Sequence, residues 1–280
     1  MPVLKYQVVN VFVTDELWSG NPLAVFEPEE TLSDETMLRL GQQMNLSEIT
    51  FVRPSDKADA HVRIFTPSYE MPFAGHPTLG TSYVIAAGRK QLMLEMQAGI
   101  IPVEIDGEQI TLSANSPSYR AGPDVAELAA AFNIDAKHII GTPRFVNTGS
   151  EQLVVPLDSP ESVARCTLDL AKFEQVACNL EGRSGALVWA KSGDTIIARY
   201  FWSQHGQAAE DFGTGSACAN LGGWLLAENT PLPLQLKMEQ GHSIGRIARL
   251  SLSINTNKQI HIGGKVRRIG EGTFKLAAEI

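Results

Sequence analysis

Two stretches of the chain, Pro72–Gly80 (PFAGHPTLG) and Asp211–Ala217 (DFGTGSA), decide the fold and hold its strongest pattern. In each, glycine stands directly before a predicted helix, which runs through Ala87 after the first turn and through Leu226 after the second. A helix start offers unpaired backbone N–H groups and a partial positive charge, and glycine lets a ligand approach the backbone closely. We therefore expect each turn to hold part of a small anion, such as a carboxylate.

Outward from the two turns, the chain shows one order of elements written twice. In each half, strand-like runs rich in Val, Ile and Phe precede the turn, and further strands follow the helix. Self-similarity over such a distance is typical of two similar lobes, with chance likeness of two strand–turn–helix units as the competing interpretation. The matching letters are Ile64-Phe65 with Tyr200-Phe201, Gly75 with Gly213 to within two residues, and Met96–Gly99 with Met238–Gly241.

A group of prolines and serines around Ser116–Gly122 interrupts the pattern between the two copies. Such a composition is typical of a join between lobes. We therefore expect an N-terminal lobe of residues 1–116 and a C-terminal lobe of residues 117–280. The last strand, about residues 270–280, is a candidate for packing on the N-terminal lobe.

The composition limits the classes of partner and the cellular compartment that we expect. The 280 residues carry a formal net charge of -8 without a sustained run of Lys or Arg, which argues against nucleic acid and an anionic membrane as partners. No apolar stretch approaches the length of a membrane span, and Met1–Val13 has the pattern of a strand, not of a leader. Cys166, Cys178 and Cys218 lack metal-ligand spacing, so we expect a reduced, cytoplasmic protein without a bound metal.

Several blocks of sequence, in order along nearly the whole chain, resemble those of the PhzF (phenazine-biosynthesis-like) family. Each block alone is loose, but the set and its order are specific. The blocks are Gly20–Phe26 (GNPLAVF), Asn45–Phe51 (NLSEITF), Ile64–Pro67 (IFTP), Pro72–Gly80, Glu210–Ala217 (EDFGTGSA) and Gln240–Arg246 (QGHSIGR).

The resemblance implies the diaminopimelate-epimerase-like fold. This is an α+β architecture of two pseudo-symmetric lobes, each a curved, mostly antiparallel, barrel-like sheet wrapped around a central helix, with the active site in the cleft between the lobes. The resemblance also implies a homodimeric, cofactor-independent isomerase, similar to trans-2,3-dihydro-3-hydroxyanthranilate isomerase. Such an enzyme moves a proton within a small, anionic, carboxylate-bearing metabolite.

Carried over residue by residue, the resemblance implies Glu48 as the catalytic acid and base, with His76 and Asp211 as further catalytic residues. The loop before Asp211 departs from the family, because Gly206 and Glu210 lie further apart than in the phenazine-pathway enzymes. We therefore expect a reshaped loop, which leaves the substrate open. The substrate-binding residues that the resemblance implies are Ser47, Gly75, Gly215 and Ser216.

The residues at the two turns also bear on the chemistry. Related epimerases use two thiols, one at each helix start, but Ala74 and Phe212 stand at these places and cannot accept a proton. Two-thiol racemisation is therefore disfavoured, and a carboxylate whose pKa is raised by burial can take the role. Glu48 stands beside Ile49 in a predicted strand whose alternate residues are buried. Desolvation would raise its pKa and a nearby helix start would lower it, and the sequence leaves this balance open.

Plainer interpretations stand beside these. Glu48 is also compatible with an exposed strand residue, Asp211 with a turn former, His76 with a polar group at a helix start and Ser216 with a helix cap. For the function, there are two alternatives to the isomerase. One is an epimerase or racemase with Glu48 and Asp211 as opposed bases, and the other is a non-catalytic protein that binds a small acid or regulates in response to it.

Overall fold

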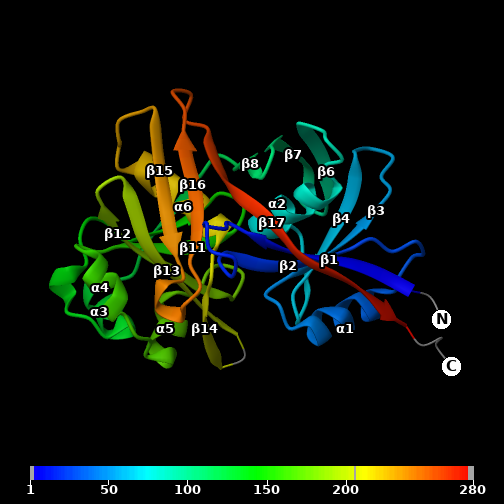
Figure 1. The fold of residues 1–280 in the computed structure, drawn as a ribbon. Coiled ribbons are helices and arrows are strands. Elements are labelled where there is room, and N and C mark those ends of the chain that lie inside the picture. The colour runs from blue at the N-terminus through cyan, green and yellow to red at the C-terminus, as the bar shows by residue number, and fades with distance from the viewer. Residues whose placement is uncertain (1–2, 205, 277–280) are drawn as a thin grey trace. The chain divides into compact units, whose positions relative to one another are not determined.

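The computed structural model describes residues 3–204 and 206–276 (Figure 1), and the chain divides into two compact units. The first unit comprises the residues up to Leu112 and those from Gly263 onward. The second unit comprises the residues from Ser113 to Ile262. The first crossing comes a few residues before the expected join at 116/117. The return comes earlier than residue 270, because β17 (Ile260–Lys275) is one continuous strand that pairs with β1 (Val3–Val11) from Val266 onward.

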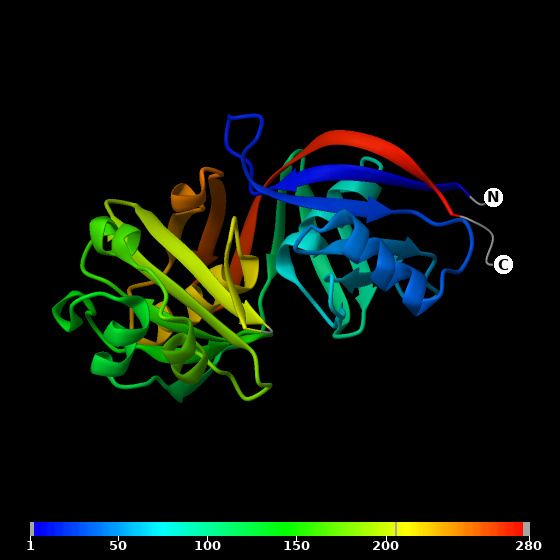
Figure 2. The ribbon, with the colours of Figure 1, turned by 90° about the horizontal axis from the view of Figure 1, so that it is seen from below.

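The strands of the first unit close into a barrel. Their order is β17–β1–β2–β3–β4–β6–β7–β8 and back to β17, with the short β5 paired to β4. Figure 2 shows β17 and β1 running side by side. The further bounds are β2 Asn21–Phe26, α1 Asp34–Met44, β3 Ile49–Arg53, β4 Ala60–Phe65, β5 Glu70–Met71, α2 Gly75–Ile85, β6 Gln91–Met96, β7 Gly99–Asp106 and β8 Gln109–Ser113.

Helix α2 is the central helix of this barrel, and it contacts β1, β2, β3 and β7. Its residues from Gly75 to Ser82 are all buried, because the helix is apolar or small on every side. A Cβ at Gly80 would lie 2.6 Å from the side chain of Leu23, so the close packing requires glycine. The hydroxyls of Thr78 and Ser82 donate to backbone carbonyls one turn earlier, which satisfies both in the core.

Helix α1 packs on the barrel with its apolar face, where Met37 and Leu40 join a core of phenylalanines. Ser33 caps its start by accepting from the backbone N–H of Thr36, and Asn45 ends it in the left-handed conformation. A serine followed by an apolar-periodic run is the sequence signal of such a helix start. The described part of the chain contains no helix that is both long and apolar enough to cross a membrane.

The second unit repeats the arrangement. Its strand order is β9–β10–β11–β12–β13–β15–β16, with β14 paired to β13, and the buried α6 contacts β10, β11 and β16. Helices α3 and α5 contribute to the unit's apolar core. The bounds are β9 Ser118–Ala121, α3 Val125–Phe132, η1 Ala136–His138, β10 Arg144–Asn147, β11 Glu151–Pro156, α4 Pro160–Arg165, α5 Leu170–Val176, β12 Ser184–Ser192, β13 Thr195–Gln204, β14 Gln207–Asp211, α6 Gly215–Ala227, β15 Leu234–Gln240, η2 His242–Ile244 and β16 Ala248–Ile254.

The strand registers confirm the internal repeat and correct two of its predicted matches. Ile49 pairs with Phe65 as Ala186 pairs with Phe201, which confirms the first match. The match of Met96 with Met238 is wrong by two residues, and the match of Gly75 with Gly213, made to within two residues, is refined by two. A two-residue shift keeps each side chain on the same face of a strand, and in the turn glycine stands at both 213 and 215, so the letters alone could not detect either shift. The corrected matches are Leu94 with Met238 and Gly75 with Gly215.

Together these features confirm the α+β fold class, with helices wrapped in curved sheets.

Candidate functional site

Glu48 lies in the connection between α1 and β3, directly before the strand begins. Its side chain is 17% exposed, and its Oε2 has no hydrogen-bond partner among the described residues. Burial raises the pKa of Glu48 to about 7, although a hydrogen bond from Ser47 opposes the shift. Near neutral pH this carboxyl therefore exchanges a proton readily, as an acid and base must. The interpretation of Glu48 as an exposed strand residue is wrong.

His76 is the group that faces this carboxyl. It is the second residue of α2, is 5% exposed, and places its Nδ1 3.5 Å from Oε2 of Glu48. The residue before Gly75 is Ala74, whose side chain makes no capping hydrogen bond. A ligand anion can therefore occupy the place that a capping side chain usually fills.

Asn21 lies beside the candidate residue Ser47 and was not singled out by the sequence analysis. Its side chain is 1% exposed, and its Oδ1 accepts a hydrogen bond from Ser47 Oγ at 3.5 Å. It begins β2 directly after Gly20, whose φ of 78° requires glycine. The signal in the sequence was a polar residue at the start of an otherwise apolar strand.

In the second unit, Asp211 ends β14 and belongs to a tightly bonded turn. Its Oδ2 accepts from Thr214 Oγ1 at 2.5 Å, and its backbone carbonyl accepts from Nε2 of Gln240 at 2.8 Å. Gln240 is fully buried and also accepts from the backbone N–H of Thr214 through Oε1. The turn before α6 is thus fixed by a side chain from β15, which the letters of the turn did not reveal.

Ser216 is the second residue of α6 and does not cap the helix. The cap position belongs to Thr214, so the interpretation of Ser216 as a helix cap is wrong. The hydroxyl of Ser216 instead accepts from Nε2 of Gln152 at 2.9 Å, and Oε1 of Gln152 accepts from the fully buried Asn220. Gly215, the first residue of α6, is buried beside it. This turn holds its polar groups in a fixed network.

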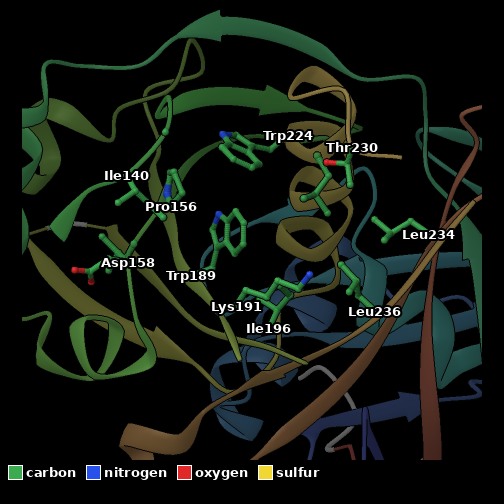
Figure 3. A pocket seen from close by; sticks show the side chains of 13 residues that line it. Ile140, Pro156, Asp158, Trp189, Lys191, Ile196, Trp224, Thr230, Leu234 and Leu236 are labelled. Atoms are coloured by element: carbon green, nitrogen blue, oxygen red, sulfur yellow. The ribbon is translucent and has the colours of Figure 1, made fainter. Parts of the chain in front are cut away.

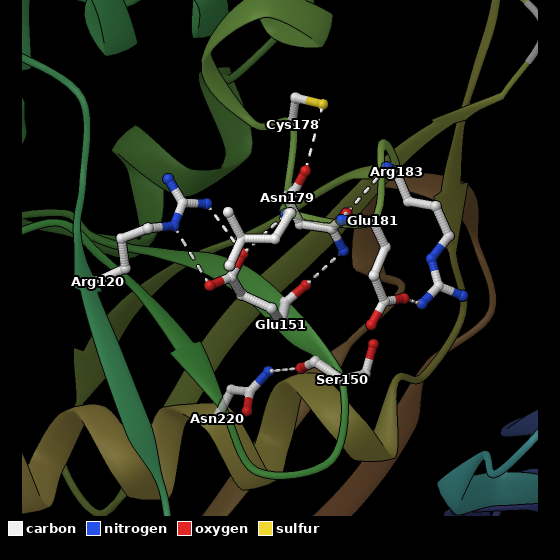
Figure 4. Close-up of polar contacts among 9 residues, drawn as sticks. Arg120, Ser150, Glu151, Cys178, Asn179, Glu181, Arg183 and Asn220 are labelled. Atoms are coloured by element: carbon white, nitrogen blue, oxygen red, sulfur yellow. Dashed lines mark hydrogen bonds and ion pairs between the residues drawn. The ribbon is translucent and has the colours of Figure 1, made fainter.

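Figure 4 shows polar contacts next to this network, from Asn220 to Ser150 and around Glu151. Asn220 donates to the backbone carbonyl of Ser150 at 2.8 Å. The neighbouring Glu151 accepts from Arg120 at 2.9 Å and from the backbone N–H of Leu180 at 3.1 Å. The bond from Arg120 lowers the pKa of Glu151, so this carboxyl stays ionised, unlike Glu48.

A separate hollow of ≈ 220 Å³ lies in the second unit, between Trp189, Trp224 and apolar residues around them (Figure 3). None of the predicted site residues lines it. Nowhere in residues 3–204 and 206–276 do three or more His, Cys, Asp or Glu side chains form a group that could hold a metal ion.

The structure thus gathers the predicted residues into two groups. The first unit holds Ser47, Glu48, Gly75 and His76 together, and the second holds Asp211, Gly215 and Ser216. That the two groups face one cleft stays a prediction.

Comparisons with known proteins bear on the family and the fold. The family model described as phenazine biosynthesis-like protein matches residues 9–273. An uncharacterized isomerase of Pasteurella multocida is 34% identical, over 95% of this chain and 92% of its own length. The trans-2,3-dihydro-3-hydroxyanthranilate isomerase of Pseudomonas aeruginosa is 34% identical over 88% of each chain. The crystal structure of a Bacillus anthracis phenazine biosynthesis protein of the PhzF family has the same fold. It superposes with a TM-score of 0.87, is 24% identical, and is covered over its full length by 99% of this chain.

Proposed function

The chain belongs to the phenazine biosynthesis-like protein family and is an isomerase of the PhzF type, and on that premise we propose that it moves a proton within a small carboxylate-bearing molecule, with Glu48 as acid and base. One observation supports this proposal above the others. The carboxyl of Glu48 is buried, has no hydrogen bond on Oε2 among the described residues, and has a pKa of about 7. Buried polar atoms are usually hydrogen-bonded, so this open carboxyl oxygen, together with the raised pKa, favours a role in proton transfer.

The proposed step is an internal proton shift. Ionised Glu48 removes a proton from a carbon whose C–H bond is activated by conjugation, and the electron pair of that bond enters the conjugated system. The protonated carboxyl then delivers the proton to another carbon of the same molecule. One C–H bond breaks, another forms, and the formula of the substrate does not change, so no oxidant or cofactor is required.

His76 and the helix starts serve the ligand in this scheme. Nδ1 of His76 lies close enough to Glu48 to steady the ionised carboxylate or to contact a polar atom of the substrate. The start of α2 offers backbone N–H groups to the substrate carboxylate, and the fixed turn before α6 offers a second set.

Glu48→Gln tests the proposal, with trans-2,3-dihydro-3-hydroxyanthranilate as the first compound. The variant keeps the size of the side chain and loses its proton transfer, so we expect kcat to fall about 10³-fold while the compound still binds. Turnover is followed by absorbance and by NMR of the product. The matched control is Glu104→Gln, which changes an exposed glutamate of β7 and should leave the rate unchanged.

The pH profile of the wild type gives a second test of Glu48 as the base. Because the base must be ionised, kcat/KM should rise with pH through about 7, the pKa of Glu48. Near-wild-type turnover by Glu48→Gln would exclude Glu48 as the base.

A further inference from the structure

The two units carry the same ion pair at the same place in the repeat. In the first unit, Arg63 of β4 donates from Nε and Nη2 to the two carboxylate oxygens of Glu70 in β5, at 2.7 and 2.5 Å. In the second, Arg199 of β13 donates from the same two nitrogens to Oε2 of Glu210 in β14, at 3.1 and 2.7 Å. Each pair joins a central strand to the short strand that precedes a helix-opening turn.

Each guanidinium also stacks on a ring of its own strand. Arg63 lies 5.1 Å from the ring centre of Phe65, and Arg199 lies 4.6 Å from that of Phe201. The side chains of the two arginines are only 15% and 12% exposed. A guanidinium held by a carboxylate and a ring face has little freedom to move.

The remaining arm of each guanidinium reaches an outer helix. Nη1 of Arg63 donates to Oδ1 of Asp34, the first residue of α1, at 2.7 Å. Nη1 of Arg199 donates to the backbone carbonyl of Cys166, at the end of α4, at 2.7 Å. Each arginine therefore ties three elements together: an outer helix, a central strand and the strand before the turn.

The glutamates stand at matching distances from the helix starts. Glu70 precedes Gly75 by as many residues as Glu210 precedes Gly215. Little chain lies between each ion pair and the turn that follows, so the position of the glutamate limits where the turn can lie. A duplicated contact of this kind, at equal spacing, points to a shared task for the two turns.

We propose that the pairs Arg63–Glu70 and Arg199–Glu210 are positioning residues that hold the two helix-opening turns in place for the ligand. The inference rests on the proposed function only in taking these turns as the ligand-holding parts. Neither arginine touches the reacting atoms in this scheme. Each acts through the strand and turn that its glutamate anchors.

Arg63→Lys and Arg199→Lys test the proposal, because lysine keeps the charge and loses the two-pronged bond and the stacking. Amide hydrogen exchange reads the turns directly and needs no substrate. We expect exchange at residues 74–76 to rise about tenfold in Arg63→Lys, with residues 214–216 unchanged, and the reverse in Arg199→Lys. The matched controls are Arg89→Lys and Arg249→Lys, whose arginines are more exposed and pair with Asp59 and Glu239, and which should change neither turn.

The kinetic constants and their pH dependence distinguish a positioning role from a merely structural one. Because α2 carries His76 beside Glu48, Arg63→Lys should lower kcat and shift the rise of kcat/KM near pH 7. Arg199→Lys should raise KM about fivefold to tenfold and leave that rise in place, because in the proposed scheme the turn before α6 only binds the ligand, whereas α2 also carries His76.

The outcomes separate the two proposals. Unchanged exchange at the turns, or faster exchange throughout the unit with a matching loss of Tm, would overturn the positioning role. If the wild type turns nothing over but the exchange effects stay confined to the expected turns, the positioning role stands and the proposed reaction fails.

Discussion

The starts of β3 and β12 hold equivalent places in the two units, but the residues there differ in kind. One position before the matched pair of Ile49 and Ala186 stand Glu48 and Gly185. In the first unit this place holds a buried carboxyl with a raised pKa. In the second it is glycine, and a Cβ there would overlap the hydroxyl of Tyr200.

The difference shows that the repeat duplicates the scaffold and not the chemistry. At its helix start, the first unit presents a carboxyl oxygen without a hydrogen bond among the described residues. The second unit ties the polar groups of its turn to one another, through Gln240 to Asp211 and through Gln152 to Ser216. The first arrangement suits proton transfer, and the second suits a fixed surface for holding a ligand.

The largest expected effect is on catalysis, and it differs between substitutions of the two acids, Glu48 and Asp211. Asp211→Asn should lower kcat/KM by about tenfold to a hundredfold, mostly through KM, because a neutral amide oxygen accepts more weakly from Thr214 than the carboxylate does, while the proposed base, Glu48, remains. Glu48→Gln should cost about 10³-fold in kcat. Steady-state kinetics of both variants at pH 8 measure the loss of kcat and the change in KM for each.

An equal loss of kcat in the two variants would break the comparison and favour the two-base epimerase. Turnover in deuterated water then decides. A two-base reaction places solvent deuterium at the stereocentre in each turnover, whereas an internal shift by one carboxyl retains part of the original proton.

The next effect is on the pH dependence of stability, and it has opposite signs for Glu48 in the first unit and Glu151 in the second. The pKa of Glu48 is about 7 in the folded protein against an ordinary value of 4.5, so between these pH values the folded state binds a proton that the unfolded state has lost. Stability should therefore fall by about 3 kcal/mol as pH rises from 4.5 to 7, and Glu48→Gln should abolish this slope. Urea unfolding across this range measures it.

Glu151 provides the contrast for that measurement. Arg120 lowers the pKa of Glu151, so its contribution to stability is present above the ordinary value and is lost as pH falls through the lowered pKa. Glu151→Gln should flatten the acid side of the curve and leave the slope between pH 4.5 and 7 intact. A slope in this window that survives in Glu48→Gln would mean that Glu48 is not buried in solution.

Most of the fold could be predicted because its signals are local. The helix starts at Ser33 and Gly75 and the strands around them follow from capping residues, glycine and apolar periodicity. The two-residue offset of Met96 in the repeat arose because strand periodicity cannot distinguish such a shift. Only the hydrogen-bonded registers, which depend on long-range pairing, fix it.

The supporting residues of the site were harder to predict. Gln152 and Gln240 lie on strands far along the chain from the turns that they bind, so no spacing links them to Ser216 or Asp211. The balance at Glu48 also required coordinates, because the extent of its burial decides whether desolvation outweighs the bond from Ser47. Tertiary packing, not local pattern, determines both.

The smallest expected effect compares the serines beside the two groups. The bond from Ser47 lowers the pKa of Glu48 against the larger effect of burial, so Ser47→Ala should move the rise of kcat/KM to higher pH by less than about one unit. Ser216→Ala removes the acceptor of Gln152 in the other unit and should raise KM by about twofold to fivefold without moving the profile. Profiles from pH 5 to 9 for both variants measure the difference. A shift of equal size in both would mean that Ser216 also acts on the base, and the division of labour between the units would then fail, because a holding surface should change affinity and not protonation.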